Sequence, residues 1–233
     1  IPTADDALMA AVRAELHAPL TRVADFGAAT SRGRVRNSNQ DAWGHLGNEL
    51  FVLADGMGGY AGGGLAARTA VSSLLSTATS RGVADWAGTI SQLNQQVRTA
   101  TRARGFDRAG TALVIVGIVG GVASVINVGD ARACRLRSGR LLQLTTDHTV
   151  EAELTRSGID VEGSSGRSVP LTALTRHIGA TEAEPDISTL VPYDRDVIVL
   201  MSDGVYRQVP EGEIRETVTG RPCREAAAGL VAL

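Results

Sequence analysis

Three apolar segments of the chain each end on an aspartate that lies beside a glycine: "FVLADG", "INVGDA" and "IVLMSDG". The three aspartates are Asp55, Asp130 and Asp203. Aspartate and glycine are common in turns, and a turn is the simpler explanation of any one segment. Three cases favour a shared site instead. The ends of buried strands meet at one rim of a sheet, where three carboxylates repel one another unless a cation lies between them.

Carboxylate and carbonyl oxygens suit a hard divalent cation, which here means Mg²⁺ or Mn²⁺. Gly56 lets the main chain approach closely, so its carbonyl oxygen is a further candidate ligand. The nearby segment "SRGRVRNSNQDAW" adds Arg36 and Asp41. Arginine binds a phosphate monoester through two parallel hydrogen bonds. Metal ions and one arginine together would form a site for phosphate ester hydrolysis.

The glycines after Asp55 also fit a second interpretation. Residues 56–61 satisfy the pattern G-x-G-x-x-[G/A] between a predicted strand and a predicted helix, which is the dinucleotide-binding fingerprint. That fold requires an acidic residue at the end of a second strand about 20 positions later. Here residues 64–79 predict a helix that leads to Asp85, beside another helix. An oxidoreductase is therefore the weaker hypothesis.

Composition excludes several other classes. The net charge of −2 gives no general attraction to nucleic acid or to an anionic membrane. The chain also has no lysine. Mechanisms that need a Schiff base, a Walker lysine or a kinase lysine are thus excluded. Cys134 and Cys223 form neither a metal-ligand pattern nor a disulfide framework. We expect a cytoplasmic monomer without membrane insertion.

Hydrophobic periodicity predicts a series of strands and helices. Residues 21–33, 49–56 and 195–204 are predicted strands, and residues 111–145 predict a meander of strands with glycine-containing turns. The predicted helices cover residues 5–17, 64–79, 86–103, 150–158, 211–220 and 222–233. Residues 158–185 are rich in small polar residues and predict a mobile surface insertion. The order predicts one α+β domain with helices covering antiparallel sheets.

Taken together, the blocks "RVRNSNQD", "VLADGMGG", "GTALV", "NVGDARACRLRSGRLLQLTTDHT" and "LMSDGV" resemble, in order and spacing, those of a known family. It is the PPM family of metal-dependent protein serine/threonine phosphatases, type 2C, in its compact bacterial form. The resemblance covers about residues 22–233. It implies a four-layer α/β-β/α sandwich, in which two antiparallel sheets are flanked by helix pairs.

The resemblance also implies a binuclear Mn²⁺ or Mg²⁺ site and a hydroxide that bridges the two ions and attacks phosphorus. Asp55 would bridge both ions, the Gly56 carbonyl would bind one, and Asp203 would bind the other. Asp130 would join Asp203 at a third ion. Asp41 would hold metal-bound water, and Arg36 would bind the substrate phosphate. The insertion at 158–185 corresponds to the mobile flap of the family.

The chain departs from the family pattern at three positions. Gln40 stands where a glutamate is usual, and Tyr60 where histidine is common. Met57 occupies the position of the histidine proposed as general acid in eukaryotic members, so protonation of the leaving group would fall to metal-bound water. The four histidines lie outside motif positions and are expected to be ordinary surface or loop residues.

The predicted function is hydrolysis of phosphoserine and phosphothreonine in proteins that a serine/threonine kinase has phosphorylated. A catalytically weakened regulatory or binding module is the alternative. We expect a helical N-terminal extension over residues 1–20 and a phosphatase domain over 21–233. Family members close with a Gly-x-Asp-Asn block that supplies a further metal ligand. The sequence has no Asp-Asn pair, so we expect it to be truncated relative to the native protein.

Overall fold

The computed structural model describes residues 25–33, 37–159 and 170–233. The predicted helix over 5–17 and the expected extension over 1–20 therefore lie outside the described residues. Eight strands form two antiparallel sheets within the described part. The larger has the order β1-β2-β3-β4-β7 and the smaller the order β6-β5-β8. The strands are β1 (Ala42–Leu46), β2 (Leu50–Met57), β3 (Gly110–Val119), β4 (Val122–Val128), β5 (Arg132–Arg137), β6 (Arg140–Gln143), β7 (Asp186–Leu190) and β8 (Val197–Met201).

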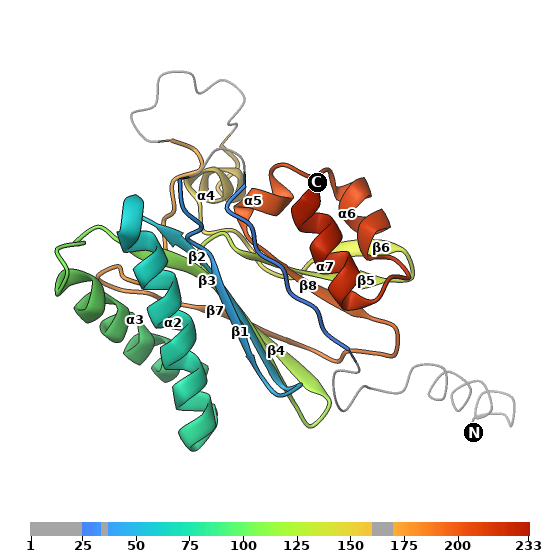
Figure 1. Cartoon of the computed structure of the whole chain (residues 1–233), viewed down its shortest axis with the longest axis horizontal. Coiled ribbons are helices and arrows are strands. Elements are labelled where there is room, and N and C mark those ends of the chain that lie inside the picture. The colour runs from blue at the N-terminus through green and yellow to red at the C-terminus, as the bar shows by residue number, and fades with distance from the viewer. Residues whose placement is uncertain (1–24, 34–36, 160–169) are drawn as a thin grey trace, which may run out of the picture.

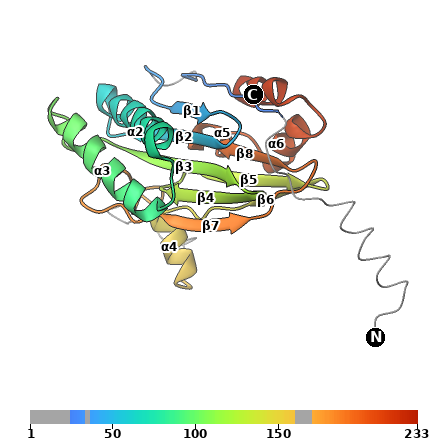
Figure 2. The same ribbon diagram turned by 90° about the horizontal axis from the view of Figure 1, so that it is seen from below.

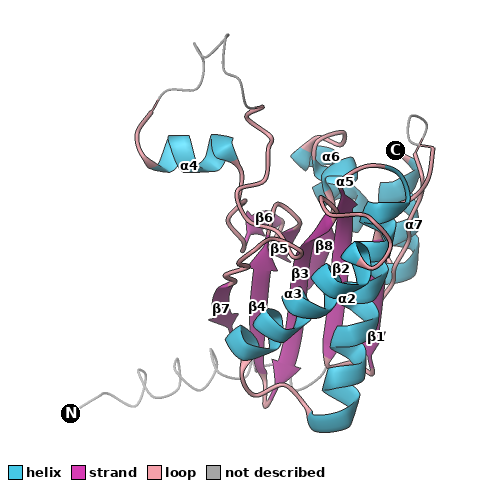
Figure 3. Cartoon of the chain, turned by 90° about the vertical axis from the view of Figure 1, so that its left-hand side faces the viewer, coloured by secondary structure: helices cyan, strands magenta, loops and turns pink. Residues whose placement is uncertain are grey.

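Helices cover the outer faces of the two sheets (Figures 1 and 2). On the five-stranded sheet lie α2 (Tyr60–Arg81) and α3 (Trp86–Arg102), which cross its face in Figure 3. On the three-stranded sheet lie α6 (Glu211–Val218) and α7 (Cys223–Ala232). Two short helices, α4 (Val150–Arg156) and α5 (Asp203–Tyr206), lie beyond the strand ends. The predicted four-layer sandwich is confirmed.

Apolar side chains fill each interface between layers. Leu74 of α2 and Ile90 of α3 pack on Ile115 of β3. Val114 and Val116, on the other face of β3, pack in the cluster that joins the two sheets. Because both faces of β3 are covered, nine of its ten residues are buried, which explains its nearly continuous apolar sequence. The third cluster places Ile214, Val218 and Leu230 of the last two helices on the three-stranded sheet.

One sequence-based expectation differs from the structure, and a second is only partly covered by the described residues. Residues 25–32 were predicted within a strand, but they form no strand; Asp25 instead accepts a hydrogen bond from the main-chain N–H of Cys223 at 3.1 Å. The insertion at 158–185 was expected to be a mobile surface segment. Its middle, residues 160–169, lies outside the described residues. In its second half, Ile178 is fully buried and exchanges main-chain hydrogen bonds with Thr111 at 2.9 Å.

Candidate active site

The strand register brings four aspartates to one rim of the sandwich. Asp41 directly precedes β1, whose first residue, Ala42, pairs with Ala54 near the end of β2. Asp41 and Asp55 are therefore neighbours. The last residue of β4, Val128, pairs with Leu113, which is adjacent to the partner of Asp55, and Asp130 lies two residues after that strand end. In the smaller sheet, Arg132 pairs with Met201, so the antiparallel pairing places Asp130 near Asp203.

Asp55 is a strongly perturbed carboxylate. Burial, together with the negative charges of Asp41, Asp203 and Asp130, raises the pKa of Asp55 from 3.8 to about 8. The main chain at this position is fixed, because the Thr111 hydroxyl donates a hydrogen bond to the Asp55 carbonyl oxygen at 2.8 Å. A half-buried carboxylate with three like charges around it is expected where a cation binds.

The glycine-rich segment after Asp55 packs too closely for side chains. A Cβ atom at Gly56 would contact the Gly63 carbonyl oxygen and would lie 2.7 Å from the Gln40 carbonyl oxygen. A Cβ atom at Gly63 would lie 2.5 Å from Gln40 Oε1. The glycines thus let the end of β2 and the first turn of α2 meet, with Gln40 against both. Gly58, with φ of 103°, adopts a left-handed conformation that favours glycine.

Asp41 is held from the opposite sheet. The Ser202 hydroxyl, 6% exposed at the end of β8, donates a hydrogen bond to Asp41 Oδ2 at 2.7 Å. The main-chain N–H of Asp41 also donates to Asn39 Oδ1 at 3.0 Å. These contacts orient the carboxylate toward the rim that it shares with Asp55. Ser202 was not predicted as a site residue, although its place directly before Asp203 was visible in the sequence.

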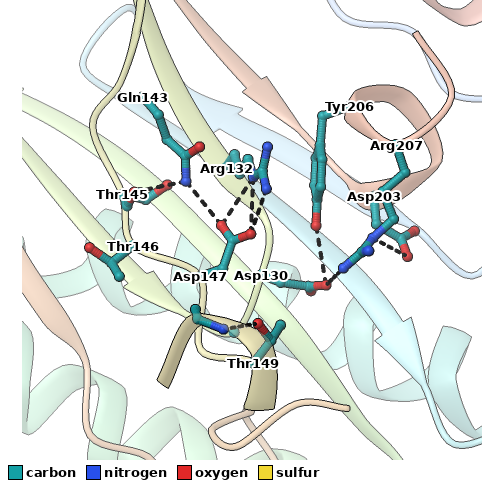
Figure 4. A network of polar contacts seen from close by, with 12 residues as sticks. Asp130, Arg132, Gln143, Thr145, Thr146, Asp147, Thr149, Asp203, Tyr206 and Arg207 are labelled. Carbon is teal, nitrogen blue, oxygen red and sulfur yellow. Dashed lines mark hydrogen bonds and ion pairs between the residues drawn. The ribbon is translucent and has the colours of Figure 1, made fainter. Parts of the chain in front are cut away.

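Asp130 and Asp203 share a set of polar contacts that the sequence did not reveal (Figure 4). The Tyr206 hydroxyl donates to Asp130 Oδ2 at 3.2 Å, and Arg207 Nη2 lies 3.6 Å from the same oxygen. Arg207 Nε lies 3.7 Å from Asp203 Oδ2. Burial and the charge of Asp203 raise the pKa of the Asp130 carboxyl, whereas the Tyr206 hydrogen bond and Arg207 act in the opposite direction.

A second arginine, Arg132, supports the side chain of Tyr206. Arg132 makes a bidentate contact with Asp147, at 3.0 Å from Nε and 2.6 Å from Nη2. Its guanidinium lies 3.7 Å from the centre of the Tyr206 ring. Gln143 Nε2 donates to the same carboxylate at 3.0 Å. Asp147 and Arg132 therefore fix the ring whose hydroxyl reaches Asp130.

His148 lies in a loop, as expected, but it is buried and is not an ordinary loop residue. This side chain is 1% exposed, and its Nδ1 accepts a hydrogen bond from the main-chain N–H of Gly129 at 3.1 Å. Its Nε2 lies 3.1 Å from Asp186 Oδ2 on β7. His148 thus connects the turn before Asp130 to the edge strand. His45 is exposed and His177 is half-buried, while His17 lies outside the described residues.

The carboxylate oxygens of the four aspartates and the carbonyl oxygen of Gly56 are of the kind that a hard divalent cation binds, although the described side chains do not surround one ion completely. Among the described residues, no three histidine, cysteine, aspartate or glutamate side chains are already placed to hold one ion. Mg²⁺ commonly binds through one or two carboxylates and keeps several waters, so complete enclosure by side chains is not required. The raised pKa of Asp55 is the observation that fits: a cation would offset the repulsion that keeps this carboxyl protonated. The predicted phosphate ligand, Arg36, lies outside the described residues.

Comparison with known proteins identifies the family. The sequence matches the protein phosphatase 2C family over residues 29–222. The chain belongs to this family. A serine/threonine phosphatase named stp from Listeria innocua is 31% identical over 208 residues, which cover 82% of each chain. The predicted enzyme class, a protein phosphatase, is confirmed.

Solved structures agree with this membership. The PPM Ser-Thr phosphatase MsPP from Mycobacterium smegmatis, crystallised with cacodylate, has 30% identity, covers 91% of each chain and gives a TM-score of 0.78. The catalytic domain of the phosphatase PstP, crystallised with two manganese ions, has 26% identity, covers 88% of this chain and 89% of that chain, and gives a TM-score of 0.73.

The family and the fold decide between the competing hypotheses. The dinucleotide-binding interpretation is wrong: the strand before the glycines, β2, pairs antiparallel with both of its neighbours, whereas that fold needs a parallel sheet. The relatives carry the names of phosphatases, which supports the enzyme over the weakened regulatory module. As for a membrane, no helix in the described part of the chain is both long and apolar enough to span one.

Proposed function

We propose that this phosphatase hydrolyses phosphoserine and phosphothreonine residues of proteins in a reaction that depends on Mn²⁺ or Mg²⁺. The observation that carries the proposal is the environment of Asp55. This carboxyl is half-buried beside Asp41, Asp130 and Asp203, and its pKa of about 8 reflects desolvation first and then these negative charges, which bound cations would offset. Divalent ions, when bound, lower the pKa of water and neutralise charge on a transferring phosphoryl group.

Each of the proposed site residues has a distinct part in this reaction. Asp55, the Gly56 carbonyl and Asp203 would hold the ions. Asp41 would orient a water molecule, and Ser202 fixes that carboxylate by its 2.7 Å hydrogen bond. Arg36 would bind the phosphate of the substrate through two parallel hydrogen bonds from its planar guanidinium.

The surroundings of the site are also part of the proposal. Residues 21–233 would form the phosphatase domain, and residues 158–185 would form a flap next to the aspartates. The flap follows α4, and the N-cap of α4 is Thr149, directly after the histidine that supports Gly129. The substrates would be proteins phosphorylated by a serine/threonine kinase. Action as a cytoplasmic monomer stays a prediction.

The test is hydrolysis by the purified chain of a phosphothreonine peptide, a phosphoserine peptide and para-nitrophenyl phosphate. We expect turnover of all three with Mn²⁺ and loss of turnover after EDTA treatment, which added Mn²⁺ restores. A phosphotyrosine peptide should react more slowly than the other two peptides. Equal rates with Mn²⁺ and with EDTA would refute the metal dependence, and absence of turnover with both Mn²⁺ and Mg²⁺ would favour the regulatory module.

A further inference from the structure

Arg207 lies between the two carboxylates that the family resemblance assigns to a third metal ion. Its Nη2 is 3.6 Å from Asp130 Oδ2 and its Nε is 3.7 Å from Asp203 Oδ2. One helical turn sets this position, since the main-chain N–H of Arg207 donates to the carbonyl oxygen of Asp203 at 3.1 Å. Figure 4 shows the guanidinium reaching toward both carboxylates.

This arrangement differs from an ordinary surface ion pair. An exposed pair contributes only about 0–1 kcal/mol, because water screens both charges. Asp130, however, is 7% exposed, and the same guanidinium also approaches a second carboxylate, that of Asp203. Two such carboxylates need a positive charge close by. Arginine stays protonated at any physiological pH, so Arg207 supplies that charge permanently.

The neighbouring side chains hold the guanidinium in place. The Tyr206 hydroxyl donates to the same Asp130 oxygen that Arg207 approaches. The Tyr206 ring lies 3.7 Å from the guanidinium carbon of Arg132 and 5.5 Å from that of Arg207. Cation–π contacts of this kind stabilise a positive charge next to an aromatic ring. Asp130 Oδ2 is thus approached by a hydroxyl and a guanidinium, which leaves it poorly suited to a metal ion.

We propose that Arg207 is the built-in counter-ion of Asp130 and Asp203 and excludes a further metal ion from this pair. A divalent cation within a few ångströms of the guanidinium would be repelled by it. The contact with Asp203 uses Oδ2, so a second carboxylate oxygen of this residue remains for the ions of the proposed function. The count of metal ions in the first test below rests on that proposed function, whereas the second test does not.

The first test counts bound Mn²⁺ by equilibrium dialysis of the full chain followed by elemental analysis. We expect Arg207→Gln to bind about one Mn²⁺ more than the wild type at the same free concentration. Adding Asp130→Asn to this variant should remove the extra ion. Arg207→Lys, which keeps the charge, and Arg215→Gln, on the exposed face of α6, should bind as the wild type does. An unchanged or lower count in Arg207→Gln would overturn the exclusion.

The second test uses EDTA, so that only the counter-ion role is measured. In thermal unfolding, Arg207→Gln should lower Tm by about 2–4 °C, the shift expected for about 1 kcal/mol in a chain of this size. In an Asp130→Asn background, the same substitution should lower Tm much less, and Arg215→Gln should have no effect. Equal losses in both backgrounds would refute the counter-ion role. Absence of Mn²⁺ binding in every variant would instead refute the metal dependence of the proposed function, and the result in EDTA would still decide the role of Arg207.

Discussion

Ser202 donates its hydroxyl hydrogen to Asp41 across 2.7 Å, and this one contact joins residues that are 161 positions apart and belong to the ends of different sheets. Because both partners lie at the aspartate rim, the hydrogen bond couples packing of the two sheets to the orientation of a proposed catalytic carboxylate. The serine acts only through Asp41, so its removal should affect catalysis without preventing metal binding.

The first prediction concerns this serine. Ser202→Ala removes the hydrogen bond, and a hydrogen bond to a charged group contributes about 1.5 kcal/mol or more. We expect kcat to fall about tenfold, since each 1.36 kcal/mol changes a rate tenfold, with little change in Mn²⁺ affinity. Steady-state kinetics and Mn²⁺ titration measure the two effects. Ser80→Ala, an exposed serine that bonds within its own helix, is the control. Unchanged kcat in Ser202→Ala would mean that Asp41 needs no such support.

The second prediction concerns Asp55. Asp55→Asn removes the negative charge and one of the two oxygens that a cation can use, and it keeps the shape of the side chain. We expect loss of most activity and a fall in Mn²⁺ affinity of at least about 100-fold, because even residues that only support a metal ligand contribute 10–100-fold. Calorimetric titration measures the affinity. Asp194→Asn, an exposed aspartate, should behave as the wild type. Normal turnover of Asp55→Asn at saturating Mn²⁺ would show that Asp55 holds no essential ion.

The third prediction is the pH dependence of stability in metal-free protein. The folded chain holds a proton on Asp55 up to about pH 8, whereas the unfolded chain releases it near pH 3.8. The folded state therefore binds more protons in this window. The free energy of unfolding should fall as pH rises from about 4 to about 8, by at most about 1.4 kcal/mol per pH unit from this group. Urea unfolding in EDTA at several pH values measures the slope. Asp55→Asn should reduce it, and an unchanged slope in that variant would assign it to other groups.

The fourth prediction concerns Arg36, whose proposed role rests on the sequence alone. Arg36→Ala removes a group that would bind phosphate in both the ground state and the transition state. Loss of such uniform binding raises KM and leaves kcat less affected. We expect KM for a phosphopeptide to rise about 10- to 100-fold, which corresponds to about 1.5–3 kcal/mol for hydrogen bonds to a charged group. A large loss of kcat at unchanged KM would place Arg36 on the transition state alone.

The fifth prediction concerns the close packing behind Asp55. Gly56→Ala places a Cβ atom against the main chain of Gly63, which cannot turn aside as a side chain can. We expect a loss of about 1–3 kcal/mol in the free energy of unfolding, the usual range for overpacking, together with weaker Mn²⁺ binding. Gly212→Ala, where no atom lies within 4 Å of the new Cβ, is the matched control. Equal stability of the two variants would show that the loop adjusts freely.

The sequence by itself determined the class of protein and most of the residues at the rim. Strand-ending aspartates and the adjoining glycines are local patterns: an apolar run predicts a strand, and glycine marks close approach of the main chain. These patterns led to Asp55, Gly56, Asp130 and Asp203, and the antiparallel register brings the segments that carry them to one rim.

The tertiary structure alone decided which side chains support those aspartates. Ser202 reaches Asp41, and His148 reaches Gly129, through contacts between segments far apart in the chain. The register of eight strands sets such contacts, and no local pattern encodes it. For the same reason Arg207 was missed. Its position follows from one turn after β8, but its role depends on Asp130, which the pairing of β5 with β8 brings within 3.6 Å.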